Sequence, residues 1–493
     1  MMGGVNRDSI PGRVHLVGIG GAHMSAIGRI LLSWGVEVSG SDLRATAVTE
    51  AVAALGARVV IGPHAAENVG DAALVVTTSA AAGDNLELLE AQRRGIPVIK
   101  RAEMVGRLMQ GKVGVGIAGC HGKSTTSGLV AYILAKTGRD PSYLIGAEMA
   151  DLGTNAAAGD GPHIVVEADE YDRAFLSYHP QVALVTNVEA DHLDYYGTWE
   201  AVQEAFAGFA SNVPVGGTLV LCASDAEAMR LGAYAAAGVD VVTYGIAGHA
   251  GHTGIRAYGH GGKGERDSAP GPEALGLADW VASEIETEGL GQSFLVSYRG
   301  RALRRLRIAL PIRHNVENAL GAVVVCRTLG LELDEIAGAL ESYRGVRRRF
   351  ELVGEVGGIA VYDDYAHHPT EIADTAAAAK THFPGRRIVA LFQPHTYARS
   401  RYLLDGFKAC FRDFDKLYIL ETYAAREAIA DGMTGAQLAS ELHAPAPGYF
   451  ETFEAAAAGI AAELRAGDVF FTVGAGDVDV VGPMVVERLG RRA

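Results

Sequence analysis

The chain has 493 residues, which is enough for about three domains of ordinary size. Apolar residues make up 49% and charged residues 20%, a composition typical of a globular protein with substantial cores. The net charge of −15 argues against general binding to nucleic acid or to a membrane surface, so we expect neither as a partner.

The four cysteines are widely spaced and form no C-x-x-C pair: Cys120, Cys222, Cys326 and Cys410. This spacing is typical of reduced thiols in a cytosolic protein. The first 13 residues contain no apolar signal core, and no run of 18 apolar residues follows. We therefore expect a cytoplasmic protein, either a monomer or a homodimer.

The N-terminal part begins as a strand, a glycine turn, a helix and a second strand. The apolar run Val14 to Gly18 ends in glycines, a helical pattern covers Ser25 to Trp34, and Val36 to Ser39 predicts the next strand. Further short strands alternate with a helix near Asn85 to Arg94. Such alternation predicts a parallel α/β sheet, in a domain covering residues 13–109.

Two more α/β units follow along the chain. The first, 110–345, begins with a strand at Val113 to Ala118 and includes a strong helix pattern at Arg313 to Thr328. The second, 346–493, again alternates short apolar runs with helical patterns. His249 to Pro272 is rich in glycine and histidine and lacks periodicity, so it is interpreted as an exposed loop.

A phosphate-loop pattern lies between the strand at Val113 to Ala118 and a helix expected over Lys123 to Lys136. It reads Gly119, Cys120, His121, Gly122, Lys123, Ser124, Thr125. Glycines allow backbone N–H groups to approach phosphate, and the helix N-terminus favours negative charge. Lys123 can reach the β- and γ-phosphates, and the Ser124 hydroxyl can bind Mg²⁺. The pattern is one glycine shorter than usual, because Ile117 occupies the first glycine position.

A second glycine-rich turn, Gly18 to Gly21, resembles the dinucleotide fingerprint, with His23 in the place of its third glycine. Asp42 ends the following strand, about twenty residues on, as that fingerprint requires. A lone match of this kind indicates a phosphate-bearing ligand more than it indicates NAD.

Acidic and histidine residues follow two strands of the middle unit. Glu167 ends the run Ile164 to Val166, and His192 lies beyond Val182 to Thr186. Because polar groups at the carboxyl ends of parallel strands face the ligand crevice, we expect Glu167 and His192 near the phosphate loop. With the Ser124 hydroxyl they form a plausible set of ligands for Mg²⁺ beside ATP.

Together these motifs resemble the Mur ligases of bacterial cell-wall synthesis, from about Arg13 to Asp477. The matching segments are G-C-H-G-K-S-T from Gly119, E-A-D-E-Y-D from Glu167, N-V-E-A-D-H-L-D from Asn187, H-N-V-E-N-A from His314, G-V-R-R-R-F from Gly345, D-D-Y-A-H-H-P-T-E from Asp363 and F-Q-P-H-T-Y-A-R from Phe392. The resemblance implies an α/β chain of three domains: a Rossmann-like N-terminal domain for a UDP-sugar, a central P-loop ATPase-type parallel sheet, and a Rossmann-like C-terminal domain for the amino acid.

The resemblance also implies a reaction. V-G-I-G-G-x-x-M-S from Val17 and D-Y-A-H-H-P-T-E are similar to the members that add L-alanine to UDP-N-acetylmuramate, with ATP and Mg²⁺, through an acyl phosphate. The basic group for the incoming amine is left open among His367, His368 and His395.

Individual roles follow from the matching positions. Ser124, Glu167 and His192 would bind the metal, and Lys123 the phosphates. The remaining implied contacts are Asn315, Asn318, Arg349 and Asp364 for ATP; Gly18, Gly20, Gly21, Asp42, Thr78 and Ser79 for the UDP-sugar; and His367, His395 and Arg399 for the amino acid.

A few positions depart from the family pattern. His23 replaces a usual glycine, Cys120 and Ser124 replace common threonines, Tyr171 replaces a serine, and Thr396 stands where many members have arginine. Serine keeps the hydroxyl for the metal, and Cys120 is interpreted as inert packing.

Three alternatives remain open. A recycling relative would join a whole murein tripeptide to the same UDP-sugar, an NAD-dependent oxidoreductase would use only the first glycine turn, and a regulatory module would bind nucleotide without catalysis. The oxidoreductase leaves the phosphate loop unexplained, and the regulatory module does not require Lys123, Glu167 and His192 together.

Overall fold

The computed structural model describes residues 10–492, except 79–80, 82, 248–277, 426 and 428–431. The predicted loop His249 to Pro272 and the predicted site residue Ser79 therefore lie outside the described residues. The chain divides into two compact units, the first made of Met1–Glu286, Ser293–Ala309 and Asn315–Val346, and the second of Thr287–Gln292, Leu310–His314 and Arg347–Ala493. Among the described residues, no helix combines the length and the apolar character needed to cross a bilayer.

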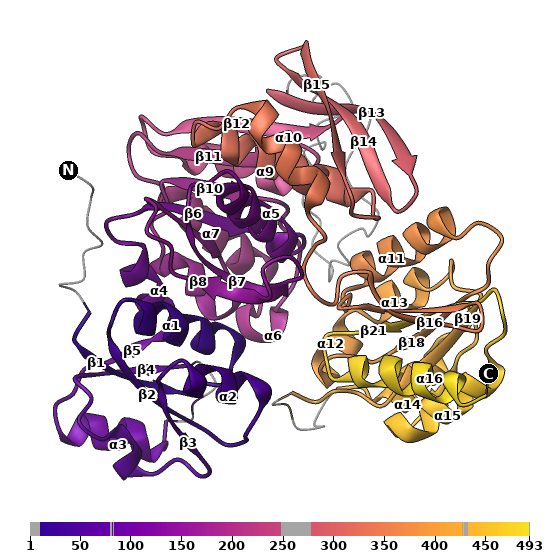
Figure 1. Ribbon diagram of the computed structural model, residues 1–493, viewed down its shortest axis with the longest axis horizontal. Coiled ribbons are helices and arrows are strands. Elements are labelled where there is room, and N and C mark those ends of the chain that lie inside the picture. The colour runs from indigo at the N-terminus through magenta and orange to yellow at the C-terminus, as the bar shows by residue number, and fades with distance from the viewer. Residues whose placement is uncertain are drawn as a thin grey trace. The chain divides into compact units, whose positions relative to one another are not determined.

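The first unit contains a five-stranded sheet near its N-terminus (Figure 1), in the order β3-β2-β1-β4-β5. The pairings that join its neighbouring strands are all parallel. The strands are β1 (Arg13–Val17), β2 (Glu37–Asp42), β3 (Arg58–Ile61), β4 (Leu74–Thr77) and β5 (Val98–Lys100), and the helices are α1 (Ala22–Ser33), α2 (Ala47–Ala54), α3 (Leu86–Arg93) and α4 (Arg101–Met109). The strand order reverses between β1 and β4, which is where ligands bind in open α/β sheets.

The first unit also contains a ten-stranded sheet, in the order β15-β14-β13-β12-β11-β10-β6-β9-β7-β8. Its strands are β6 (Val113–Ala118), β7 (Ser142–Met149), β8 (Thr154–Ala157), β9 (His163–Glu167), β10 (Val182–Val185), β11 (Thr218–Cys222), β12 (Asp240–Ile246), β13 (Trp280–Glu288), β14 (Gly291–Tyr298) and β15 (Arg301–Ile308). Strand β6 pairs in parallel with both β10 and β9. The carboxyl ends of these three strands therefore meet at one edge, beside the phosphate loop.

The helices around this sheet are α5 (Lys123–Lys136), α6 (Leu193–Tyr196), α7 (Trp199–Ser211), α8 (Ala226–Arg230), α9 (His314–Thr328) and α10 (Leu333–Ser342). Of these, α5 and α9 are largely buried. In α5 every residue from Thr125 to Leu134 is buried. A helix that is apolar on all sides needs neighbours on all sides, so α5 holds the phosphate loop on a rigid support.

The second unit has a six-stranded sheet, in the order β16-β17-β21-β18-β19-β20. Strands β16 and β17 are antiparallel, and the other pairings are parallel. The elements are β16 (Glu351–Val356), β17 (Ile359–Asp364), β18 (Ile388–Phe392), β19 (Lys416–Leu420), β20 (Gly448–Phe450), β21 (Val469–Val473), α11 (Pro369–His382), α12 (Tyr397–Tyr402), α13 (Leu404–Cys410), α14 (Gly435–Glu441), α15 (Phe453–Glu463) and α16 (Val481–Gly490).

The predicted fold class is confirmed, because three α/β sheets lie in chain order within the ranges expected for three domains. The domain limits 13–109, 110–345 and 346–493 themselves stay a prediction. Several elements have no predicted counterpart, among them α4, the β7–β8 pair and the strands β13 to β15. Strand β15 is mostly exposed, which explains why it lacks a continuous apolar run.

Candidate active site

The phosphate loop connects β6 to α5 with two left-handed glycines. Gly119 has φ 136° and Gly122 has φ 81°. A Cβ at Gly119 would lie 2.0 Å from Oγ1 of Thr186, and one at Gly122 would lie 2.4 Å from Oδ1 of Asn318. Both positions therefore require glycine for conformation and for space.

The loop is also held from the side by the two residues that follow strand β10. Thr186 Oγ1 donates to the carbonyl of His121 at 2.6 Å, and Oδ1 of Asn187 accepts the His121 N–H at 2.9 Å. These contacts fix the loop before any ligand arrives. The helix that follows points its N-terminus at the loop, as a phosphate site requires.

Lys123 is the first residue of α5, and its ammonium group is already partnered. Its Nζ lies 2.9 Å from the carboxylate of Glu170 and donates to the carbonyl of Cys120 at 3.1 Å. Burial lowers the pKa of Lys123, but the neighbouring acidic groups, Glu170 foremost, more than offset this and raise it above its usual value. Lys123 is therefore a permanent cation at the loop.

Ser124 and Glu167 are brought together next to this cation. Ser124 Oγ donates to Oε1 of Glu167 at 3.0 Å, and the Gly146 N–H donates to Oε2 at 2.8 Å. Burial raises the pKa of Glu167, against the opposing effect of Lys123. A carboxylate and a hydroxyl side by side at the phosphate loop are suited to a hard cation.

His192 lies with two other acids. Its Nε2 is 3.6 Å from Glu170 and 3.7 Å from Asp191, and one ligand atom from each of the three residues falls within 4.8 Å of the others. His192 itself has φ 54°, a left-handed conformation that aims the ring at this cluster. Sequence reasoning grouped His192 with Ser124 and Glu167 and missed Glu170.

Glu170 connects the two groups because it pairs with Lys123 and faces His192. Its side chain is 3% exposed. The motif E-A-D-E-Y-D contains it three positions after Glu167. The irregular turn after β9 brings Glu170 to the loop as well as Glu167, and the sequence motif does not indicate this.

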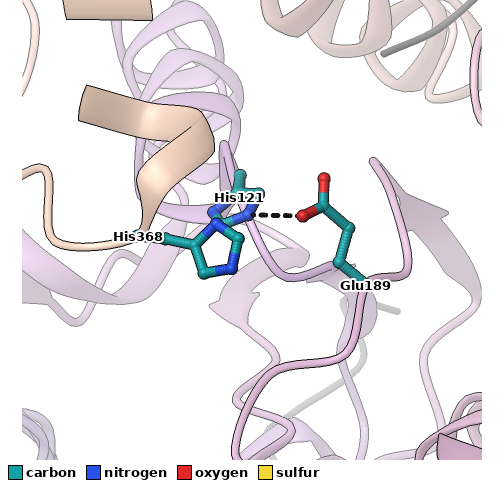
Figure 2. Close-up of side chains that lie close together, drawn as sticks. All are labelled: His121, Glu189 and His368. Atoms are coloured by element: carbon teal, nitrogen blue, oxygen red, sulfur yellow. Dashed lines mark hydrogen bonds and ion pairs between the residues drawn. The ribbon is translucent and has the colours of Figure 1, made fainter. Parts of the chain in front are cut away.

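Within the loop, His121 faces Glu189 (Figure 2), and its Nε2 lies 3.4 Å from Oε2 of Glu189. The neighbouring Cys120 Sγ accepts the Glu189 N–H at 3.1 Å. Burial raises the pKa of Cys120 well above its usual value, so its thiol stays protonated. This agrees with the expected packing role of Cys120.

Asn315 and Asn318 lie on α9 as predicted and are both buried. Asn318 Nδ2 donates to Oδ1 of Asn315 at 3.1 Å, and its amide lies against Gly122. Thr125, the last residue of the loop motif, is 8% exposed and lies inside α5. Asn318 therefore lies against the phosphate loop, and Asn315 accepts a hydrogen bond from Asn318.

The first glycine turn lies at the carboxyl end of β1. The Gly20 N–H donates to Oδ2 of Asp42 at 2.9 Å, and the Gly21 N–H donates to the Gly18 carbonyl at 3.1 Å. A Cβ at Gly18 would lie 3.4 Å from Thr78, at the end of β4. The structure thus brings these predicted residues together at the point where the strand order reverses.

His23 follows this turn, at the second residue of α1. Burial and the charge of Arg101 lower the pKa of His23 to about 4, so the ring is neutral near pH 7. Among the described residues, no hydrogen-bond partner meets its buried Nε2. Arg101 instead pairs with Asp169 at 2.9 Å.

In the second unit, Arg349 and Asp364 lie on neighbouring segments. Arg349 NH1 is 3.2 Å from Glu371, and the N–H groups of Phe350 and Ala366 donate to Asp364 at 3.0 and 2.8 Å. Burial raises the pKa of Asp364 to about 6. Asp364 is 1% exposed, so in this structure it organises the chain around it.

The predicted amino-acid residues also cluster in the second unit. Arg399 NH1 lies 3.2 Å from Nδ1 of His395, and the His395 and His367 rings are 6.0 Å apart. Thr396 has φ 65°, and its hydroxyl accepts the Arg399 N–H at 3.4 Å. Thr396 therefore caps the N-terminus of α12.

Three family models match successive parts of the chain, and all three describe Mur ligases. Residues 13–113 match the model "Mur ligase family, catalytic domain", 117–326 match "Mur ligase middle domain", and 348–476 match "Mur ligase, glutamate ligase domain". A UDP-N-acetylmuramate–L-alanine ligase from Mycolicibacterium gilvum is 41% identical, with 98% of this chain and 97% of that protein covered.

Two solved structures are also similar. A UDP-N-acetylmuramate–alanine ligase from Thermotoga maritima has a TM-score of 0.78 and 27% identity, covering 98% of this chain and 100% of that one. A murein peptide ligase from Psychrobacter arcticus has a TM-score of 0.70 and 22% identity, over 97% and 98%, which shows a shared fold. With three family models matched in order and a relative 41% identical over nearly the whole length, this chain belongs to the Mur ligase family.

Proposed function

We propose that this chain joins L-alanine to UDP-N-acetylmuramate, with ATP converted to ADP and phosphate. The observation that carries this proposal is the near-full-length similarity to proteins named for that reaction, at 41%, 39% and 40% identity. The partners are small molecules. The proposed division of labour gives 13–109 to the UDP-sugar, 110–345 to ATP and 346–493 to the amino acid.

In the first step, a lactyl carboxylate oxygen attacks the γ-phosphorus of ATP, and ADP leaves with the bridging oxygen. This converts a poor acyl donor into an acyl phosphate. Lys123 would neutralise charge on the phosphoryl group in transfer, because its ammonium lies at the loop and stays protonated. The N–H groups of the loop and the N-terminus of α5 would hold the phosphates.

Mg²⁺ fits the residues around the loop. Ser124 with Glu167 offers a hydroxyl and a carboxylate, and Glu170 with Asp191 and His192 offers further ligand atoms within 4.8 Å. The oxygen donors suit a hard cation. When bound, the ion would supply charge stabilisation for phosphoryl transfer.

In the second step, the alanine amine attacks the acyl carbon, the C–N bond forms and inorganic phosphate leaves. A basic group must take a proton from the amine. His368 is the weakest of the three candidates, because it is 4% exposed and its Nδ1 accepts the Thr370 N–H at the start of α11. His367 and His395 are favoured, with Arg399 beside His395 suited to the alanine carboxylate.

Phosphate release tests this proposal. Purified protein with ATP and Mg²⁺ is assayed with UDP-N-acetylmuramate alone, with L-alanine alone and with both. Release that requires both substrates is expected. Release that requires the murein tripeptide in place of L-alanine would transfer the assignment to the recycling relative, and no release with either acceptor would overturn the ligase.

A further inference from the structure

A buried carboxylate on helix α3, beside the N-terminal sheet, accepts four hydrogen bonds. Oε1 of Glu87 lies 2.7 Å from Nδ2 of Asn68 and 3.3 Å from Nδ1 of His64. Oε2 lies 2.7 Å from Oγ of Ser41 and 3.3 Å from Nε2 of His15. The side chains of Glu87 and His15 are 0% exposed. Burial would raise the pKa of Glu87, but hydrogen bonds from His15, Asn68 and Ser41 lower it to about 2.

An ionised carboxylate only accepts hydrogen bonds, which fixes both histidines. His15 donates from Nε2 to Glu87, and its Nδ1, 2.9 Å from Oγ of Ser39, then accepts from that hydroxyl. His64 donates from Nδ1 to Glu87. In its neutral form His64 therefore presents Nε2 as a hydrogen-bond acceptor.

His64 is the member of this network that reaches solvent, with its side chain 26% exposed. It follows the end of β3, and its Nδ1 lies 3.3 Å from Oγ of Ser41. The carbonyl of Ser41 accepts the N–H groups of Gly18 and Ile19 at 2.9 and 3.0 Å, so Ser41 supports the first glycine turn. His64 therefore contacts Ser41 directly, and Ser41 in turn holds the first glycine turn.

We propose that His64 binds the nucleoside of the UDP-sugar, and that Glu87 is the residue that positions it. Nε2 of His64 accepts a hydrogen bond from one nucleoside donor, either the imide N–H of uracil or a ribose hydroxyl. This inference rests on the proposed function, because it places the sugar nucleotide at the carboxyl edge of the first sheet. A buried carboxylate commonly fixes the tautomer and the direction of a histidine that binds another group.

If the network around Glu87 had only a structural role, its loss would destabilise the fold without changing nucleoside selectivity. Two substitutions separate these roles because each keeps one half of the imidazole. His64→Asn retains an N–H near Nδ1 for Glu87 but removes the acceptor, whereas His64→Gln retains an acceptor near Nε2.

Binding of UMP to the full chain is measured by calorimetry. We expect His64→Asn to weaken UMP binding by about fivefold to tenfold, His64→Gln to weaken it less, and Glu87→Gln to weaken it with His64 intact. Ser39→Ala is the matched control, since it removes a hydrogen bond of the same network without touching His64. Equal UMP affinity for His64→Asn and the wild type would overturn the proposal.

Modified nucleotides identify the donor. The wild type is titrated with 3-methyl-UMP, 2′-deoxy-UMP and 3′-deoxy-UMP, and one of them is expected to bind as weakly as UMP binds to His64→Asn. Discrimination against none of them would overturn the acceptor role. If the wild type binds UMP but shows no ligase activity, the proposed reaction fails while the binding role of His64 is still decided.

Discussion

Lys123 and Glu170 form a largely buried ion pair, with their side chains 13% and 3% exposed. Removing one partner of such a pair leaves the other charge buried without compensation. Lys123→Met should therefore abolish turnover and also lower the unfolding free energy by about 3 kcal/mol. Denaturant titration and the phosphate-release assay measure the two effects.

The double variant Lys123→Met with Glu170→Gln distinguishes these effects. Because the buried charge is gone, stability should return toward that of the wild type, while turnover stays absent. Full activity in Lys123→Met would contradict the phosphate role, and unchanged stability would contradict the pairing.

Asp364 gives a prediction about pH. Its pKa of about 6 in the folded chain is above the ordinary aspartate value of about 3.9, so the folded state holds the proton longer than the unfolded state. The contribution of protonated Asp364 to the free energy of unfolding is complete below pH ~4 and is lost as the pH rises through about 6. Between these values Asp364 should lower stability by up to about 1.4 kcal/mol per pH unit.

The variant Asp364→Asn should lack this slope, whereas Asp413→Asn, at an exposed position of the same unit, should retain it. Unfolding free energies from about pH 4 to about pH 7 provide the measurement. Parallel pH profiles for wild type and Asp364→Asn would show that the carboxyl does not titrate in this range.

At the scale of elements, the phosphate loop depends on glycine for two separable reasons. Gly122 and Gly138 stand on either side of α5 with similar φ values of 81° and 74°, but a Cβ meets Asn318 at 2.4 Å only at Gly122, whereas Gly138 has nothing within 4 Å. Gly138→Ala should cost about 1–2 kcal/mol for its left-handed backbone alone. Gly122→Ala should cost more and raise the KM for ATP.

Thermal unfolding and steady-state kinetics with varied ATP make this comparison. An unchanged KM for ATP in Gly122→Ala would mean that the loop tolerates displacement of Asn318, and that its close approach is not needed for nucleotide binding.

Elements with local signals could be predicted well. Strand β6 and helix α5 begin and end where the apolar run and the glycine turn indicate. Contacts that depend on irregular backbone could not be predicted. Glu170 reaches Lys123 from a position just before an irregular turn, in which Asp172 and Arg173 have φ of 55° and 54°, and no periodic pattern specifies such a turn. The network around Glu87 was missed because its members come from four separate segments.

For the whole molecule, the order of motifs along the chain predicted three α/β sheets, and the three family models follow the same order. The roles of single residues are less constrained, because a motif does not state which partner each side chain meets. The proposed ATP and amino-acid residues belong largely to different units. Kinetic effects of substitutions should therefore separate by substrate.

Arg399 tests that separation. Its guanidinium beside His395 is suited to the carboxylate of the incoming amino acid, and such a charged hydrogen bond contributes about 1.5–3 kcal/mol. Arg399→Ala should raise the KM for L-alanine at least about tenfold and leave the KM for ATP within about twofold. Arg401→Ala, which removes an exposed arginine from the same helix α12, should change neither. A higher KM for ATP in Arg399→Ala, with that for L-alanine unchanged, would place this guanidinium at the nucleotide and move the amino-acid site to another part of the second unit.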